Sequence, residues 1–272
     1  MIKAAMLQCQ PLKVGSSNMR TYALTGGASG IGAALAKALA DQGHRIINVD
    51  IKDADIIADL STPEGRQAAV AGVREMAPDG LDGLVPLAGV PGGGPPGTLI
   101  TAVNFYGTVE FLEGLKDLLA LKKGSVVLLC SNSGPMSSGE ENLLHALLES
   151  NEEEALRIAK EEDDGMHYMV GKRALNYWMR RHCMAYAQMG IRMNAVAPGP
   201  VETPMTAPLL EDPVMAPVIE SLLDATPLKR MGKPQEIAEC ILFLLGPQAS
   251  YVCGSLLFID GGFDSHSRTD HI

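Results

Sequence analysis

The chain has 272 residues, of which 46% are hydrophobic and only 4% aromatic, and its formal net charge is −10. This length fits one large α/β domain. The negative charge argues against a nucleic-acid or anionic-membrane surface as a partner. Ten of the acidic residues lie within 140–164, so the remainder of the chain is close to neutral. The five cysteines are widely spaced and form no Cys-x-x-Cys pair, which indicates neither a disulfide framework nor a metal site.

The sequence predicts neither a membrane span nor a secretory signal. No apolar run approaches the roughly 18 residues that a membrane span needs, and residues 1–18 lack a sustained apolar stretch. The widely spaced cysteines favour reduced thiols in a cytoplasm, so we predict a cytoplasmic protein without membrane contact. Residues 1–18 are expected to form a tail that is disordered or not native, and residues 19–272 a single domain.

Apolar, strand-like runs alternate with helical patterns from residue 21 onward. The runs that predict strands are 21–25, 45–50, 83–89, 125–131, 191–198 and 255–260. Pro86 is unusual for the interior of a strand. Short apolar runs separated by helices indicate parallel strands with crossover connections. The pattern predicts a single Rossmann-type, doubly wound parallel sheet of about seven strands with helices on both faces.

Four main helices are expected between these strands. The first follows a glycine-rich turn and ends at Gly43. The second begins at Ser61, which has capping-box spacing to Glu64, and ends near residue 77. The other two are expected over about 98–121 and 166–189.

The stretch TGGASGIG, residues 25–32, joins the first expected strand to the first helix. Glycines in this context allow a tight turn and a close approach of backbone N–H groups to a pyrophosphate. Asp50 ends the second strand, where a carboxylate accepts hydrogen bonds from ribose hydroxyls and repels a 2′-phosphate. These residues predict a dinucleotide site that takes NAD rather than NADP, although Lys52 lies close enough to soften this preference. The alternatives are a plain Gly/Ala-rich turn and a turn-forming Asp.

Tyr168 and Lys172 stand four residues apart on the expected helix 166–189, so their side chains share one face. Oxidising a secondary alcohol requires a base for the hydroxyl proton, and a free tyrosine with a pKa of about 10 is a poor base at neutral pH. A nearby ammonium favours tyrosinate and lowers the pKa of the phenol. Gly171 leaves room for a cofactor beside this helix. The alternative is an ordinary surface pair.

Seven motifs in this order resemble the short-chain dehydrogenase/reductase family. They are TGGASGIG (25–32), ADL (58–60), VNFYG (103–107), LLCS (128–131), YMVGK (168–172), IRMNAVAPGPVETP (191–204) and FIDGG (258–262). The resemblance implies four catalytic residues, Asn104, Ser131, Tyr168 and Lys172. Ser131 is expected to bind the substrate oxygen, with Ser133 as its competitor, and Asn104 to support a water chain that joins Lys172 to solvent. Taken singly, Ser131 also fits a strand-end turn and Asn104 a capping or buried position.

The resemblance also implies a set of cofactor-binding residues. This set comprises Gly26, Ser29, Gly30, Ile31, Gly32, Asp50, Asp59, Leu60, Ala88, Gly89, Tyr168, Lys172, Pro198, Gly199, Val201 and Thr203. Asp59 is expected to contact the adenine. The family further implies a homodimer or homotetramer.

Two departures narrow the resemblance. The family usually has Asn-Asn-Ala-Gly after the third parallel strand, whereas this chain has Pro86-Leu87-Ala88-Gly89, which leaves open how that strand is tied to the Asn104 helix. A helical acidic insert at about 135–165 separates the serine from the tyrosine. It is either a solvated flap, or a cover for the site mouth or for a helix face otherwise used for assembly. These features resemble the 3α-hydroxysteroid dehydrogenase/carbonyl reductase group of the family.

This resemblance implies an NAD(P)-dependent oxidoreductase that interconverts a bulky apolar secondary alcohol, such as a 3α-hydroxysteroid, and its ketone. Residues 200–230 are apolar and rich in Met and Pro, and they coincide with the mobile substrate loop of the family. Packing of this stretch on the core is the other interpretation. The alternative enzymes are an aromatic alcohol or diol dehydrogenase and a ketoacyl-carrier-protein reductase, the latter disfavoured by the acidic insert. A dinucleotide-sensing protein is the non-enzyme alternative.

Overall fold

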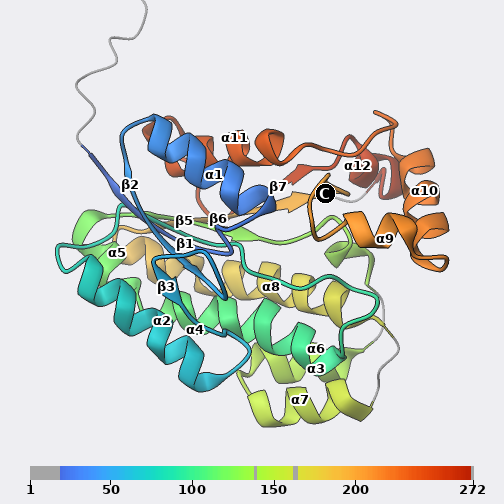
Figure 1. Cartoon of the computed structure of the whole chain (residues 1–272), viewed down its shortest axis with the longest axis horizontal. Coiled ribbons are helices and arrows are strands. Elements are labelled where there is room, and N and C mark those ends of the chain that lie inside the picture. Colours follow the sequence, from blue (N-terminus) through green and yellow to red (C-terminus); the bar gives the residue numbers. More distant parts are fainter. Residues whose placement is uncertain (1–18, 138–139, 162–164, 271–272) are drawn as a thin grey trace, which may run out of the picture.

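The computed structural model describes residues 19–137, 140–161 and 165–270 (Figure 1). Its centre is a seven-stranded sheet in the order β3-β2-β1-β4-β5-β6-β7, and every pair of neighbours is parallel. The strands are β1 (Thr21–Thr25), β2 (Arg45–Asp50), β3 (Ile56–Ile57), β4 (Gly83–Pro86), β5 (Ser125–Leu129), β6 (Arg192–Pro198) and β7 (Leu256–Ile259). The predicted fold class is confirmed. The predicted tail 1–18 lies outside the described residues.

The strand that contains Pro86 is shorter than the predicted run 83–89. The β4 strand pairs with β1 along its whole length, but it pairs with β5 only at Gly83 and Leu84. On the β1 side the next donor is Leu87, whose N–H donates to Thr25 O at 3.0 Å, an ordinary length for a backbone hydrogen bond. Pro86 therefore costs the sheet no ladder hydrogen bond, because pairing with β5 has already ended before it.

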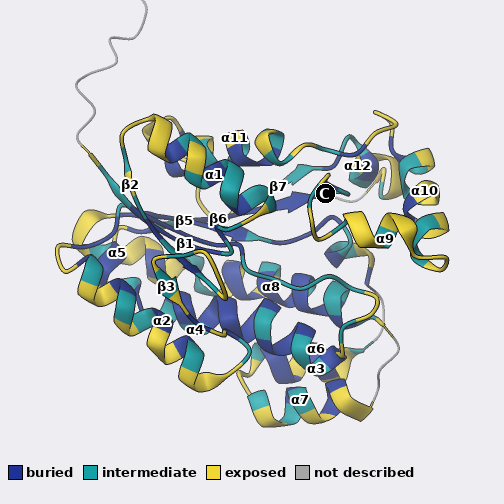
Figure 2. Ribbon diagram, in the orientation of Figure 1, coloured by how far each residue is buried: buried dark blue, intermediate teal, exposed yellow. Residues whose placement is uncertain are grey.

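Helices cover both faces of the sheet. In Figure 1, α1 (Gly30–Asp41) and α11 (Pro234–Leu245) lie on one face, and α2 (Pro63–Met76), α4 (Gly107–Glu113) and α8 (His167–Gln188) lie on the other. Their apolar sides form two clusters of buried residues, one on each side of the sheet. Figure 2 shows these buried sides facing the strands and the exposed sides facing outward. Such a two-faced core holds the strand ends in fixed positions.

The prediction of a single helix over 98–121 is wrong. The segment instead comprises α3 (Gly97–Thr101), the π-helical turn η1 (Ala102–Tyr106), α4 and α5 (Lys116–Lys122). The break between α4 and α5 coincides with a side-chain contact from α2, since Arg74 donates to Gly114 O from Nε at 3.1 Å and from Nη2 at 2.7 Å. A carbonyl engaged in this way is satisfied without a continuing helix.

The start of α2 also differs by one residue from the prediction. Thr62, and not Ser61, is the N-cap, and its hydroxyl accepts a hydrogen bond from Gly65 N at 3.1 Å. Pro63 then occupies the first helical position, where a missing N–H costs nothing.

The insert forms two helices, α6 (Glu141–Leu148) and α7 (Glu152–Glu161), joined by a short turn. Their apolar residues are buried; these are Leu143, Leu144, Ala146, Leu147, Ala155, Ile158 and Ala159. The α6 helix packs on α8, and α7 packs on α3 and η1. The insert is therefore a docked layer that covers the outer side of these helices. Its described acidic residues Glu141, Glu149, Glu153 and Glu161 are exposed.

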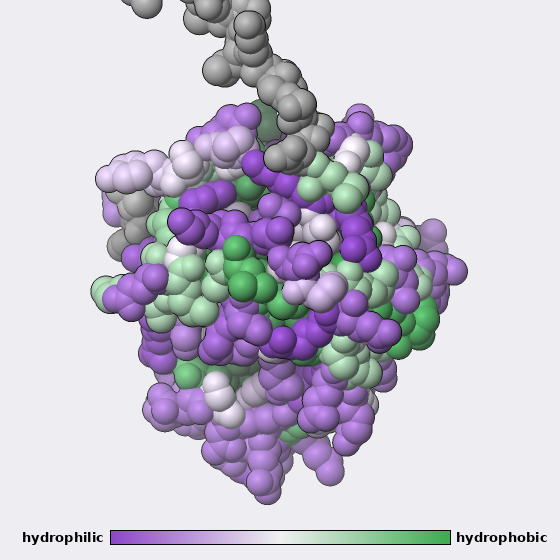
Figure 3. Space-filling model, turned by 90° about the vertical axis from the view of Figure 1, so that its left-hand side faces the viewer, coloured by the Kyte–Doolittle hydropathy of each residue, from purple (hydrophilic) through white to green (hydrophobic). Residues whose placement is uncertain are grey.

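The surface at the amino-terminal edge of the sheet is mostly hydrophilic, and its hydrophobic side chains lie in small scattered groups (Figure 3). No helix within the described ranges is both long and apolar enough to cross a membrane.

Candidate active site

Predicted site residues end or follow six of the strands, so they lie at the carboxyl-terminal edge of the sheet. The glycine-rich loop follows β1, Asp50 ends β2, Asp59 follows β3, Ala88 follows β4, and Ser131 follows β5. Pro198 ends β6, and α8 crosses beside it. In open parallel sheets this edge, next to the point where strand order reverses, is where ligands bind. Here the reversal falls between β1 and β4.

The glycine-rich loop is held too closely for side chains. Gly26 has φ +74°, and a Cβ atom there would lie 2.6 Å from Ala88 N. A Cβ atom at Gly32 would lie 2.1 Å from Gly26 O, so this position needs glycine. A Cβ atom at Gly30 would lie 3.3 Å from Thr203 Cγ2. The loop therefore contacts two other predicted cofactor residues, one after β4 and one after β6.

Asp50 lies directly beside this loop. Its Oδ2 accepts a hydrogen bond from Ala28 N at 3.1 Å, and its Oδ1 accepts one from Ile51 N at 2.7 Å. Asn48, which the sequence analysis missed, accepts from Gly27 N through Oδ1 at 2.9 Å. Residues two apart in a strand share a face, so Asn48 could have been found from its spacing to Asp50. Both side chains fix the loop against β2.

Tyr168, Lys172 and Ser131 come together as predicted. Lys172 is only 5% exposed, and its Nζ donates to Leu129 O at 2.7 Å. The same Nζ lies 5.6 Å from the centroid of the Tyr168 ring. Ser131 is buried at the end of β5, and its Oγ is 2.9 Å from Ser133 Oγ. The two serines that are candidates for binding the substrate oxygen are thus direct neighbours. Beside Gly171 there is open space, because a Cβ atom there would meet no heavy atom within 4 Å.

The pKa values of this group correct one expectation. Burial raises the pKa of Tyr168, while its hydrogen bond with Ser131 acts in the opposite direction. We expected Lys172 to lower the pKa of Tyr168. In the protein without cofactor this pKa is instead raised, because desolvation of the phenol is the largest effect. Burial likewise lowers the pKa of Lys172 to about 8. Burial therefore disfavours both the tyrosinate form of Tyr168 and the ammonium form of Lys172.

Asn104 is 1% exposed and lies within the π-helical turn. Its Oδ1 accepts from Val90 N at 2.8 Å, and its Nδ2 donates to Val90 O at 3.0 Å. The side chain thereby ties the segment after β4 to this helix, which answers the question left by the missing Asn pair. π-Helical turns are frequent at functional sites because they displace one residue from the regular helix.

We expect Asn104→Ala to lower the free energy of unfolding by about 1–3 kcal/mol, because the N–H and C=O of Val90 lose their partners in a part-buried setting. Urea denaturation measures this change. Thr108→Val is the matched control, since it removes one hydroxyl that donates to Asn104 O at 3.0 Å and should cost less. An Asn104→Ala protein as stable as the wild type would contradict the role given to these two bonds.

The predicted substrate stretch 200–230 forms α9 (Ala207–Glu211) and α10 (Met215–Ala225) beside the strand ends (Figure 1). Packing on the core is not its main role, since no residue of α9 is buried and only Ile219 of α10 is. Met215 Sδ lies 3.0 Å from the position of a Cβ at Gly93, and a Cβ at Gly92 would lie 3.0 Å from Tyr168 Cβ. The glycine segment thus packs against both Met215 of α10 and Tyr168.

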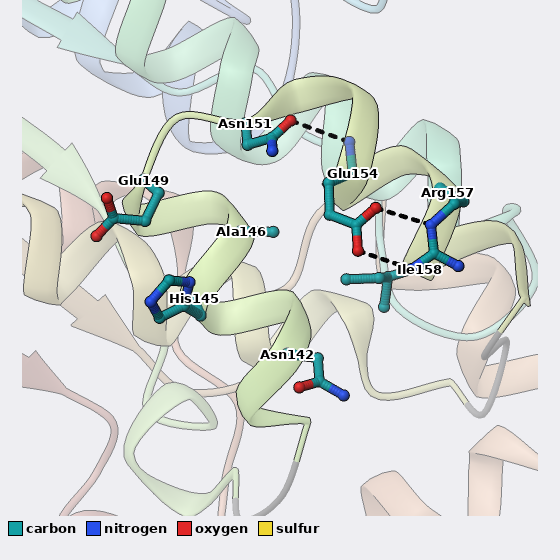
Figure 4. Close-up of a pocket in the computed structure, with 8 residues that line it drawn as sticks. All are labelled: Asn142, His145, Ala146, Glu149, Asn151, Glu154, Arg157 and Ile158. Atoms are coloured by element: carbon teal, nitrogen blue, oxygen red, sulfur yellow. Dashed lines mark hydrogen bonds and ion pairs between the residues drawn. The ribbon is translucent and has the colours of Figure 1, made fainter.

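A separate surface pocket of about 570 Å³ lies between α6 and α7 (Figure 4). It is lined by Asn142, His145, Ala146, Glu149, Asn151, Glu154, Arg157 and Ile158. Two of the charged residues that line it pair with each other, since Glu154 Oε1 lies 2.7 Å from Arg157 Nη2. None of the catalytic candidates lines this pocket, so it is distinct from the site around Tyr168.

Two family models match the chain. Residues 20–143 match the model described as short chain dehydrogenase, and residues 154–264 match the model described as enoyl-(acyl carrier protein) reductase. The interval between the two matches falls within the insert.

Individual relatives extend over nearly the whole chain. It is 38% identical over 260 residues to a 3-alpha-hydroxysteroid dehydrogenase/carbonyl reductase of Comamonas testosteroni, a match that covers 92% of this chain and 98% of the relative. It is 31% identical to a coniferyl-alcohol dehydrogenase of Pseudomonas sp. (strain HR199 / DSM 7063), with 89% and 95% covered. Among solved structures, it is similar to the 3-alpha-hydroxysteroid dehydrogenase from Pseudomonas sp. B-0831 complexed with NADH. That match has a TM-score of 0.89 and 40% identity, and covers 93% of this chain and all of the other.

Proposed function

This chain belongs to the short-chain dehydrogenase family, and from that premise we propose that it is an NAD-dependent oxidoreductase. It interconverts a bulky apolar secondary alcohol, such as a 3α-hydroxysteroid, and the corresponding ketone. The observation that carries the proposal is the buried Lys172 amine next to the Tyr168 ring and Ser131 at the edge of the sheet.

The cofactor proposal rests on the fit of the glycine-rich loop. Glycines at Gly26 and Gly32 allow the tightly packed loop, and such a loop lets backbone N–H groups approach a diphosphate. The room beside Gly171 suits a nicotinamide ribose. Gly26 and Gly32 would border the diphosphate, Asp50 the adenosine ribose, and Lys172 the nicotinamide ribose. NAD, when bound, supplies the hydride acceptor and a positive charge near the phenol.

Tyr168 then acts as the general acid and base. In oxidation its phenolate takes the substrate hydroxyl proton, and in reduction its hydroxyl returns that proton to the alkoxide. Ser131 donates to the substrate oxygen and holds it beside the phenol. Lys172 stabilises the phenolate by its charge, which opposes the desolvation that raises the pKa of Tyr168.

An apolar substrate is supported by the helix pair next to the site. Large hydrophobic side chains are exposed on this stretch, among them Met205 (38%), Leu210 (45%) and Val218 (47%). Exposed apolar groups gathered beside a site usually mark a ligand or partner surface. Methionine adapts its shape to bulky ligands.

Turnover of a substrate panel tests the proposal. NADH absorbance is followed with 3α- and 3β-hydroxysteroids, cyclic ketones, and aryl alcohols and diols. Hydroxysteroids are expected to have the highest kcat/KM. A preference for aryl alcohols would favour the alternative of an aromatic alcohol dehydrogenase, to which the 31% identical coniferyl-alcohol relative gives weight. NADH binding without turnover of any of these substrates would instead favour a dinucleotide sensor.

Asp50 is expected to make the protein prefer NAD(H) to NADP(H) by at least about tenfold in kcat/KM, because a second negative group beside it costs several kcal/mol. Asp50→Asn keeps an oxygen for the hydrogen bond from Ala28 N and should reduce this preference. Steady-state kinetics with both cofactors measures it. Equal kcat/KM for the two cofactors in the wild-type protein would disprove the role of Asp50.

The proposal places the enzyme in the cytoplasm as a homodimer or homotetramer. Because α6 and α7 cover the outer side of α8 and α3, self-association is expected through a different face. Size measurement in solution tests the assembly state.

A further inference from the structure

Arg66 lies on the first turn of α2 and is 1% exposed, although it carries a full charge. Its Nε pairs with Glu110 Oε2 at 2.7 Å, and its Nη2 contacts both carboxylate oxygens of Glu152 at 2.8 and 2.7 Å. Glu110 belongs to α4, whereas Glu152 opens α7 of the insert. One buried guanidinium thus joins three helices, and a charge in this position requires its partners.

The same guanidinium reaches the turn that carries two predicted cofactor residues. Nη1 of Arg66 donates to Leu60 O at 3.4 Å, next to Asp59. The backbone N–H of Arg66 also bonds to Thr62 O at 3.0 Å, which closes the first turn of α2. On the other side, a Cβ atom at Gly107 would lie 3.1 Å from Leu60 Cβ, so α4 is packed closely beneath this turn.

These contacts form a continuous link from the insert to residues 58–62, the adenine-side turn. Removing one carboxylate leaves the buried guanidinium with a single acidic partner, and its most accessible response is to shift toward the remaining one or toward water. Either shift alters the hydrogen bond to Leu60 O. Docking of α7 thereby affects the position of the adenine-side turn.

We propose that Arg66 is a positioning residue through which the insert helix α7 holds the adenine-side turn in its cofactor-binding conformation. The inference rests on the proposed function in one respect, the assignment of residues 58–62 to the adenine end. It assigns the acidic insert a role in cofactor affinity, apart from any role in covering a helix face. The insert then acts on the half of the cofactor that is remote from Tyr168.

Glu152→Gln tests the proposal, because Glu152 is partly exposed (26%) and its loss should not prevent folding. We expect the affinities for NADH and for AMP to fall about fivefold to tenfold, in the range of measured couplings between neighbouring side chains. The affinity for nicotinamide mononucleotide and kcat at saturating NADH should stay unchanged. Titration calorimetry and steady-state kinetics measure these four quantities.

Two variants serve as controls. Glu153→Gln removes the same charge from the exposed neighbouring position and should leave AMP affinity unchanged. Glu152→Asp keeps the charge and should retain most of the affinity that the glutamine variant loses.

Hydrogen exchange of the ligand-free protein provides a readout that does not depend on any cofactor. Glu152→Gln should speed exchange in residues 58–66 and leave residues 168–172 unaffected. Wild-type AMP affinity together with unchanged exchange at 58–66 would overturn the proposal, as would an equal loss of AMP and mononucleotide affinity. A wild-type protein that binds neither NADH nor AMP would refute the proposed function, while the exchange result would still decide whether Arg66 transmits the effect.

Discussion

Replacing Tyr168 by phenylalanine is expected to abolish measurable turnover and to leave NADH binding nearly intact. The change removes one hydroxyl, and positioned proton transfer contributes about 10²–10⁴-fold to a rate. The aromatic ring remains, so its contact with the Lys172 ammonium is kept and the position of Lys172 should not change. Steady-state rates in both directions and NADH titration measure the two effects separately.

Tyr177→Phe is the matched control for this experiment. Tyr177 lies on the same helix with 38% of its surface exposed, and its hydroxyl accepts a hydrogen bond only from Arg173 Nε among the described contacts, at 3.3 Å. This variant should keep wild-type turnover. If Tyr168→Phe retains half of the wild-type rate, Tyr168 is not the proton donor and another hydroxyl, with Ser131 and Ser133 nearest, must carry that role.

Local sequence signals were sufficient for the parts of the fold that repeat a simple pattern. The bounds of β1 and β2 agree with the predicted runs 21–25 and 45–50. Each run is bounded by turn-forming residues and is long enough to cross the sheet. The strand β3 was not predicted, because two residues, Ile56 and Ile57, carry no periodicity.

Contacts between distant segments account for what the sequence did not predict. The helix expected over 98–121 breaks where Arg74, 40 residues earlier, binds Gly114 O. The bond between Asn104 and Val90 replaces a motif that the chain lacks, and only the packed structure brings the two together. Arg66 and Glu152 are separated by 86 residues. No local pattern distinguishes Glu152 from the solvated acidic residues beside it.

The catalytic group shows the same division between local and long-range information. Spacing alone placed Tyr168 and Lys172 on one face of the helix. The resemblance to the family implied that Ser131 belongs to the same site. Their pKa values depend on how deeply the surrounding segments bury them, which spacing does not specify. The prediction that the pKa of Tyr168 is lowered is therefore wrong for the protein without cofactor. The charge of Lys172 favours the tyrosinate, whereas desolvation of the phenol opposes it.

Because the charge of Lys172 opposes the effect of burial on Tyr168, the effect of Lys172→Met should depend on pH. Since burial lowers the pKa of Lys172 to about 8, its positive charge is present below that pH and is lost above it. A positive charge favours tyrosinate and lowers the pKa of Tyr168, so removing it should raise that pKa and slow alcohol oxidation most where the wild-type lysine is charged.

We expect kcat/KM of Lys172→Met for oxidation to be lower than wild type by about 10²–10³-fold at pH 7, and the ratio of wild type to variant to fall as pH rises from 7 to 10. Arg173→Met is the control, because Arg173 lies next in sequence but pairs outward with Glu141 at 3.1 Å, so its loss should not alter the pH profile. A ratio that stays constant across this range would mean that Lys172 acts by holding the ribose or the carbonyl of Leu129 and not by its charge. A falling ratio would instead identify the ammonium as the group that offsets the burial of the phenol.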